Sequence, residues 1–316
     1  MNGHGPRSER STGHPPVKSI GDLVQELSSQ LGSASEARWV LGRATGWGGA
    51  QLLSRSHMHG QVPDHVAVEV EKMVERRRSG EPLQYVLGRW AFRSLEVSVD
   101  RRVLVPRPET EQVVGYALEE LRVSAAAVVP GQPVVAVDLG TGSGVIALSL
   151  AAEAEVAASS AFEVWATDYY ADALDVARAN LSLLAGVDPF AAARVCLSEG
   201  SWFDALPPGL AGHVQLLVSN PPYVSVSEWE SLEPVVRDYE PRRALVAGET
   251  GLEVLELLVS GAPAWLVRGG VLVLELAPDQ AGTIAVKAKS AGFDQVEVRP
   301  DLAGRPRALV ARRSGA

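Results

Sequence analysis

Apolar residues recur with two different spacings in the two parts of this chain. Between residues 19 and 88 they return every three or four positions, as in the series Ile20, Leu23, Val24, Leu27 and Leu31. That spacing puts them on one face of a helix and predicts three or four short helices in a small bundle. From residue 106 onward, short continuous apolar runs alternate with helical segments. Such alternation predicts an α/β fold with a doubly wound, mostly parallel sheet.

Two further segments flank or join these predicted domains. Residues 1–18 are rich in Gly, Pro, Ser and His, so we expect a disordered tail and no targeting peptide. Residues 89–105 alternate enough between apolar and polar side chains to predict a hairpin that connects the domains. The helical domain is therefore expected over 19–88 and the sheet domain over 106–316.

Polar residues mark the expected ends of several helices. Ser19 with Asp22 and Ser33 with Glu36 have the spacing of capping boxes, the first in a weaker form. Three arginines, 76–78, end a later helix, and we favour a solvated helix end over a contact with an acidic group. Further helices are expected from the 106–111 segment to Leu121, from Tyr170 to Asn180, and from Thr250 with Glu253 as its capping partner. The predicted strands cover 134–139, 162–167, 194–197, 214–219 and 270–275, with a closing hairpin at 295–298 and 307–311.

Composition argues against several classes of function. The net charge of −9 argues against a non-specific nucleic-acid binder, which needs a basic face. The single cysteine, Cys196, cannot form an internal disulfide and fits a reducing cytoplasm. No run approaches the ~20 apolar residues that span a bilayer. His57, His59 and His65 lie near one another in the sequence, but the loop-like surroundings without cysteine lead us to predict no metal site.

A glycine-rich turn follows the first predicted strand of the sheet. It reads Gly140-Thr141-Gly142-Ser143-Gly144 and precedes a helix. Glycine lets the backbone approach a ligand closely with positive φ, and the start of the helix leaves free N–H groups. The next strand ends at Asp168, where a carboxylate can accept both hydroxyls of a ribose. These residues indicate a nucleoside-binding domain and leave open whether its ligand is a nicotinamide cofactor or S-adenosylmethionine.

The tetrapeptide Asn220-Pro221-Pro222-Tyr223 follows a later apolar strand. The prolines fix φ and cannot continue a ladder, so we expect the carbonyl of Pro221 to face outward beside the Asn220 carboxamide. Two acceptors side by side suit a planar NH2 group, whose face the ring of Tyr223 would cover. By itself the tetrapeptide is more simply interpreted as a turn; the glycine motif upstream reverses that preference.

Together these motifs resemble the amino-group methyltransferases that use S-adenosylmethionine. The chain from Ser19 to its end is similar to the release factor glutamine methyltransferase family, of the HemK/PrmC type. The similarity extends to five further segments: 82–88 (Pro-Leu-Gln-Tyr-Val-Leu-Gly), 105–111 (Val-Pro-Arg-Pro-Glu-Thr-Glu), 239–242, 248–252 and 301–305.

This resemblance implies a Rossmann-like sheet of seven strands and transfer of a methyl group from S-adenosylmethionine to a glutamine side-chain amide. The glutamine lies in the Gly-Gly-Gln motif of peptide chain release factors, in translation termination. The implied catalytic residues are Asn220, Pro221 and Tyr223, which with Pro222 also bind the substrate. The implied cofactor-binding residues are Gly140, Thr141, Gly142, Ser143, Gly144, Asp168, Trp202 and Asn220. Trp202 is equally well interpreted as a core residue.

The resemblance also implies the partners. We expect release factors to be bound with help from the helical domain, with no direct nucleic-acid or membrane contact, by a monomer in the cytoplasm. The alternative is an amino-group methyltransferase acting on a base in RNA or DNA, which would have to extrude its base. A nicotinamide dehydrogenase or a non-catalytic nucleotide-binding adaptor is disfavoured by the G-x-G-x-G spacing and by Asn220.

The chain departs from the family pattern at several positions. Relatives tend to have Asp-x-Ser after the second strand, whereas this chain has Asp168-Tyr169-Tyr170. We expect a tyrosine to line the adenine pocket in place of the serine. Ser94 replaces a glycine of the hairpin, and Arg243 replaces an apolar residue. From the resemblance, Arg107 is expected to help order the cofactor cleft.

Overall fold

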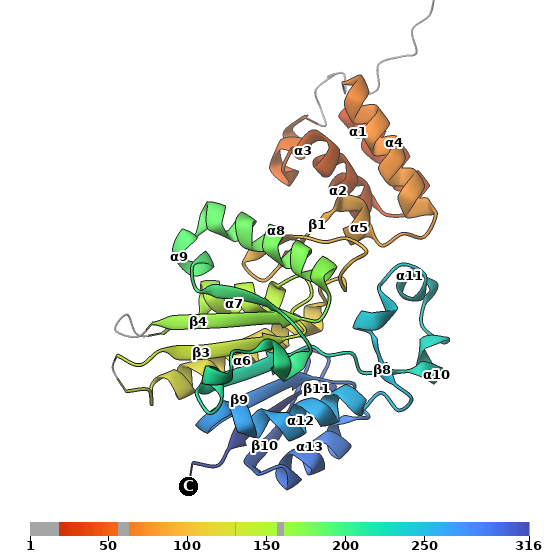
Figure 1. The fold of residues 1–316 in the computed structure, drawn as a ribbon. Helices are drawn as coiled ribbons and strands as arrows, with labels where there is room; N and C mark the ends of the chain where they lie inside the picture. Colours follow the sequence, from red (N-terminus) through yellow and green to blue (C-terminus); the bar gives the residue numbers. More distant parts are fainter. Residues whose placement is uncertain (1–18, 56–62, 130, 157–160, 316) are drawn as a thin grey trace, which may run out of the picture. The chain divides into compact units, whose positions relative to one another are not determined.

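The computed structural model describes residues 19–55, 63–129, 131–156 and 161–315, and the chain divides into two compact units between Leu87 and Gly88 (Figure 1). The expected tail over residues 1–18 lies outside the described residues, as do His57 and His59. Within the described ranges, no three His, Cys, Asp or Glu side chains are grouped to hold a metal ion. No helix in those ranges is long and apolar enough to cross a membrane.

The first unit is helical, as predicted, although its described residues form five helices where three or four were expected. They are α1 (Ile20–Leu31), α2 (Ala34–Thr45), α3 (Gly49–Arg55), α4 (Asp64–Arg78) and α5 (Leu83–Leu87). Their apolar faces meet in a shared core that includes Leu27, Leu41, Val70 and Val86, each buried. The three- to four-residue spacing of apolar side chains therefore predicted the packing face correctly.

The helix ends of this unit confirm one of the two predicted capping boxes and contradict half of the other. At α1 the capping box is complete, because Ser19 and Asp22 bond each other's backbone N–H at 3.1 Å. At α2, Ser33 accepts the N–H of Glu36 at 3.2 Å, but the Glu36 carboxylate accepts hydrogen bonds from Arg77 at 2.8 and 3.1 Å. The capping box of Ser33 and Glu36 is thus only half formed, because the charged Arg77 side chain competes for the Glu36 carboxylate.

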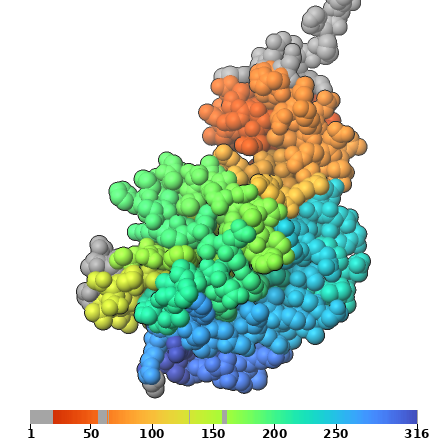
Figure 2. All heavy atoms as spheres, viewed as in Figure 1, coloured from red at the N-terminus to blue at the C-terminus, as the bar shows by residue number. Residues whose placement is uncertain are grey.

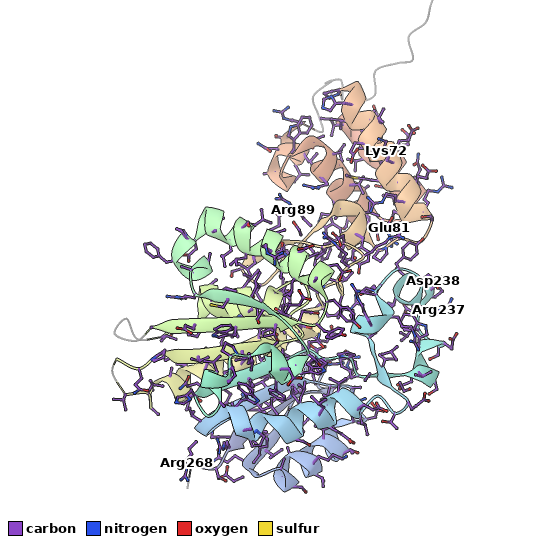
Figure 3. All side chains as sticks on the ribbon, viewed as in Figure 1. Lys72, Glu81, Arg89, Arg237, Asp238 and Arg268 are labelled. Atoms are coloured by element: carbon purple, nitrogen blue, oxygen red, sulfur yellow. The ribbon has the colours of Figure 1, made fainter. Side chains whose placement is uncertain are left out.

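Two of the three arginines at the end of α4 are paired, so the expected solvated helix end was wrong for them. Arg77 bonds Glu36, and Arg76 donates from Nε and Nη2 to the buried Glu81 carboxylate at 2.8 and 2.9 Å. Glu81, labelled in Figure 3, lies in the turn between α4 and α5. Because these contacts tie α4 to its neighbours, the arginines serve the packing of this unit.

The second unit begins with a short hairpin and a long helix. Strands β1 (Arg89–Phe92) and β2 (Leu95–Ser98) pair antiparallel, so the predicted hairpin is shorter than expected. Helix α6 (Pro108–Ala125) starts with proline in its first turn and with acidic residues after it, as helix starts favour. The Pro106–Glu111 segment therefore leads directly into a helix, as the sequence predicts.

A seven-stranded sheet forms the core of the second unit, as predicted. Its strands lie in the order β10-β11-β9-β6-β3-β4-β5, and only β11 runs against the others. They are β3 (Val134–Leu139), β4 (Phe162–Asp168), β5 (Val195–Glu199), β6 (Val214–Ser219), β9 (Leu266–Glu275), β10 (Phe293–Pro300) and β11 (Pro306–Arg313). All side chains of β3 and β6 are buried, because a central parallel strand is covered on both faces.

Helices cover this sheet. They include α7 (Val145–Glu153), α8 (Ala171–Val187), α9 (Pro189–Ala192), α12 (Glu253–Trp265) and α13 (Ala281–Ser290). Figure 1 shows α12 and α13 side by side against the strands of the carboxyl-terminal half. Thr250 does not cap α12: the helix begins at Glu253, whose carboxylate accepts the Thr250 N–H at 2.8 Å.

The chain between β6 and α12 makes an excursion from the sheet. It contains β7 (Val224–Ser225), α10 (Val226–Trp229), α11 (Pro234–Arg237) and β8 (Val246–Gly248), with β7 and β8 paired parallel. Figure 2 shows this cyan segment forming one continuous surface with the blue carboxyl-terminal part of the same unit. In Figure 3, Arg237 and Asp238 lie together on it, with 3.0 Å between Nε and Oδ1.

Candidate active site

A cleft opens at the carboxyl ends of the parallel strands in the second unit. Residues that follow β3, β4, β5 and β6 all line it, together with the segment before α6 and the segment before β8. Neighbouring strands β3 and β6 lie where the strand order of the sheet reverses, which is where α/β sheets bind ligands. The cleft encloses about 920 Å³ of empty space, counting the solvent at its mouth.

The glycine turn after β3 is held against the end of β4. Gly140, Gly142 and Gly144 have φ of +73°, +55° and +86°, which only glycine adopts without strain. Asp168 at the end of β4 accepts the N–H of Gly142 at 2.9 Å through Oδ2 and that of Tyr170 at 3.0 Å through Oδ1. Burial raises the pKa of Asp168, and these two backbone bonds oppose that rise.

Two buried polar residues support this turn from behind. Asp138 accepts from Thr141 Oγ1 at 2.6 Å and from the Ala147 N–H at 3.2 Å, and burial raises its pKa to about 7. Asn180 of α8 donates to the carbonyls of Ser143 at 2.8 Å and Ser98 at 3.0 Å. The turn is thus fixed by side chains from its own strand and from a helix far along the chain.

Trp202 contacts both the apolar core and the cleft. It follows β5 with φ of +46°, an uncommon value for a residue with a Cβ. Its ring lies so close to Gly140 that a Cβ on the glycine would be 3.2 Å from Trp202 Cζ3. Part of the side chain packs on the apolar core and part lines the cleft. Trp202 therefore joins the core to the cleft wall.

Asn220 lies at the end of β6 with its carboxamide held by α6. Its Nδ2 donates to Thr110 Oγ1 at 3.1 Å, and Thr110 Oγ1 donates to Glu275 Oε2 at 2.7 Å. The hydroxyl of Tyr223 donates to Glu275 Oε1 at 3.3 Å. Thr110 and Glu275 are 3% and 1% exposed, so these hydrogen bonds form where water does not compete for them.

Arginine side chains hold the rim of the cleft. Arg107 forms an ion pair with the buried Glu240, whose second oxygen accepts the Val105 N–H at 3.0 Å. Arg243 pairs with Asp172 on α8, and its guanidinium lies 4.1 Å from the centre of the Tyr170 ring. Both arginines line the cleft, and their ion pairs hold the segments before α6 and before β8 in place at its wall.

The structure brings most of the predicted site residues to this cleft. Its lining includes Gly140, Thr141, Gly142, Ser143, Asp168, Trp202, Asn220 and Pro222, together with Tyr169 and Tyr170. Three predicted residues do not line it: Gly144 caps α7, Pro221 is buried, and Tyr223 points its hydroxyl at Glu275. The sequence predictions missed Thr110, Asn180, Glu240 and Glu275. One signal was present for Glu275, since an acid that ends an apolar strand is the pattern that identified Asp168.

Comparisons with known proteins cover both units. Residues 22–88 match the family model described as the PrmC N-terminal domain. A release factor glutamine methyltransferase from Deinococcus radiodurans is 44% identical over 301 residues, which are 93% of this chain and 98% of that protein. One from Streptomyces coelicolor is 41% identical over 264 residues, 83% of this chain and 86% of that protein.

A solved structure shares the fold. The catalytic domain of hMettl16, determined with an RNA hairpin, matches with a TM-score of 0.51 at 12% identity and covers 82% of this chain and 86% of its own. At that identity the likeness concerns the fold, which is the seven-stranded methyltransferase sheet with its flanking helices.

Proposed function

This chain belongs to the release factor glutamine methyltransferase family, and we propose that it methylates the side-chain amide of the glutamine in the Gly-Gly-Gln motif of peptide chain release factors. S-adenosylmethionine is the proposed methyl donor. One observation carries the proposal beyond family membership: the Asn220 carboxamide and the Asp168 glycine turn line the same cleft. The proposed acceptor for the substrate amide and the proposed nucleoside site therefore face a common space.

The residues present fit S-adenosylmethionine. An ionised carboxylate has about four lone-pair positions. Among the described residues, two backbone N–H groups donate to Asp168, which leaves acceptors for the two ribose hydroxyls. A Cβ at Gly142 would meet no protein atom within 4 Å, so its backbone is open to a ligand. Trp202 and Tyr170 supply flat apolar faces in the same cleft for an adenine ring.

The bound S-adenosylmethionine would supply a methyl group on a positively charged sulfur, which makes that carbon electrophilic. The protein must then align a poor nucleophile, because an amide nitrogen shares its lone pair with the carbonyl. We propose that Asn220 Oδ1 accepts an N–H of the substrate amide and holds its nitrogen toward the methyl carbon. The methylated nitrogen is acidic and loses its surplus proton to water, so no dedicated base is required.

We assign substrate recognition to the helical unit and methyl transfer to the sheet unit. Every residue that lines the cleft belongs to the second unit, which leaves the first available to grip a protein substrate. We further propose that the enzyme acts as a monomer in the cytoplasm, without binding nucleic acid directly.

Incubation with radiolabelled S-adenosylmethionine tests this proposal against an RNA substrate. Parallel reactions contain a bacterial release factor, the same factor with its Gly-Gly-Gln glutamine changed to alanine, or ribosomal RNA. We expect label only in the unaltered release factor. Label in the RNA, or equal label in both release factors, would contradict the proposed substrate.

A further inference from the structure

A chain of hydrogen bonds behind Asn220 joins three distant parts of the sequence. Asn220 follows β6, Thr110 lies in the first turn of α6, and Glu275 ends β9. The donors run in one direction, from Asn220 Nδ2 to Thr110 Oγ1 at 3.1 Å and from Thr110 Oγ1 to Glu275 Oε2 at 2.7 Å. Thr110 lines the cleft beside Asn220.

The direction of this chain follows from the chemistry of a hydroxyl. Thr110 has a single hydroxyl hydrogen, and Glu275 takes it. The Thr110 oxygen can then only accept a bond from Asn220, which requires the NH2 end of the carboxamide to face Thr110. The Oδ1 end must face the other way. Because the two ends of an asparagine amide are nearly equal in shape, only hydrogen bonds decide between the two orientations.

We propose that Thr110 and Glu275 are positioning residues that hold the Asn220 carboxamide with its oxygen available to the substrate amide. The inference rests on the proposed function, because it assigns the oxygen to the N–H of the substrate. Without the two residues, the carboxamide can turn over and present its NH2 group. A donor there would face a substrate NH2 group and could not orient it.

The same chain links the orientation of Asn220 to the protonation of Glu275. A proton on Glu275 Oε2 would donate to Thr110, whose own hydrogen would then be free to bond Asn220 Oδ1. The charged and titratable groups around Glu275 are Arg307 of β11, Glu109 of α6 and Tyr223. Burial, together with Glu109, raises the pKa of Glu275 to about 7, although the hydrogen bonds from Thr110 and Tyr223 and the charge of Arg307 favour the carboxylate. The rate of methyl transfer is therefore expected to increase as the pH rises through neutrality.

Thr110→Val and Thr110→Ser form a matched pair for the test. Valine keeps the branched shape and removes the hydroxyl, whereas serine keeps the hydroxyl. Single-turnover transfer to a release factor is measured at saturating S-adenosylmethionine from pH 5.5 to 8.5, and affinity for S-adenosylmethionine is measured by calorimetry. We expect Thr110→Val to slow transfer about tenfold or more, to leave that affinity unchanged and to flatten the pH profile. Thr110→Ser should restore the rate and the profile.

A spectroscopic measurement on the wild-type protein is independent of activity. The side-chain NH2 signal of Asn220 in a 1H–15N spectrum is identified by its loss in Asn220→Ala. We expect its chemical shifts to titrate near neutral pH in the wild type and in Thr110→Ser, and to stay constant in Thr110→Val.

The outcomes separate this inference from the proposed function. A wild-type enzyme that labels no release factor refutes the function, and the NH2 titration then decides the inference alone. If the wild type is active but the valine and serine variants share one rate and one pH profile, the positioning role is wrong. A wild-type NH2 signal that does not change with pH would overturn the link between the protonation of Glu275 and the orientation of Asn220.

Discussion

The Asp168 carboxylate accepts the backbone N–H of Gly142 at 2.9 Å. This bond ties the end of β4 to the glycine turn after β3, so two motifs that lie 26 residues apart in the chain form one wall of the cleft. Asp168 thereby has two tasks, since it holds the turn and still offers acceptors to the cleft.

Replacing Asp168 with alanine should weaken the binding of S-adenosylmethionine. Hydrogen bonds to a charged group contribute about 1.5–3 kcal/mol, so the dissociation constant should rise roughly tenfold or more. Calorimetric titration measures it. Asp175→Ala is the matched control, because Asp175 is exposed on α8, the helix that follows Asp168, and forms an ion pair with Arg178. Equal affinities in the two variants would remove Asp168 from the binding site.

Asn220→Ala should nearly abolish transfer while leaving the affinity for S-adenosylmethionine largely intact. Removing one preorganised polar group at a reacting centre costs about two to three orders of magnitude in rate. Single-turnover methylation at saturating S-adenosylmethionine is the measurement. A rate close to that of the wild type would refute the amide-orienting role of Asn220.

Gly251→Ala should both destabilise the fold and disturb the loop after Asn220. Gly251 has φ of +79°, and a Cβ there would lie 2.7 Å from the carbonyl oxygen of Tyr223. Gly269→Ala is the matched control, because Gly269 has φ of +75° with no atom within 4 Å of a Cβ. Both variants carry the cost of positive φ, roughly 1–2 kcal/mol, and Gly251→Ala adds about 1–3 kcal/mol of overpacking.

Urea unfolding and transfer rates measure that difference. We expect Gly251→Ala to unfold at lower urea concentration than Gly269→Ala and to lose transfer, which the control should keep. If the two variants unfold together and transfer equally fast, the loop is not packed as described.

A chain that begins at Gly88 should still bind S-adenosylmethionine, because all residues lining the cleft lie beyond that point. It should lose most of its activity on an intact release factor through weaker substrate binding, which raises KM more than it lowers kcat. Circular dichroism first establishes that the shortened chain folds. If the folded chain keeps the kcat/KM of the full chain, the helical unit has no part in substrate recognition.

The sequence predicted the residues whose role is set by their neighbours in the chain. The glycine turn, Asp168 and Asn220 each follow an apolar strand, and the ends of parallel strands meet at one edge of a sheet. Thr110 was placed in a helix start and in a segment shared with the family, but it was given no role of its own, because nothing local indicates that its hydroxyl meets Glu275, 165 residues away.

One misjudged detail and one contact that the sequence did not predict have the same cause. Glu36 has the spacing of a capping residue, yet Arg77, 41 residues away, takes its carboxylate. Tyr223 follows Asn220 closely, yet its hydroxyl turns to the buried Glu275. In both cases a charged group from another element competes with the local interaction, and sequence spacing does not reveal that competitor.

Tandem mass spectrometry of a release factor, after reaction with the enzyme and S-adenosylmethionine carrying a deuterated methyl group, tests the central claim most directly. We predict one added methyl group on the side-chain nitrogen of the Gly-Gly-Gln glutamine, and none after reaction with Asn220→Ala for the same time. A methyl group on any other residue, or an unmodified glutamine after reaction with the wild-type enzyme, would contradict the account.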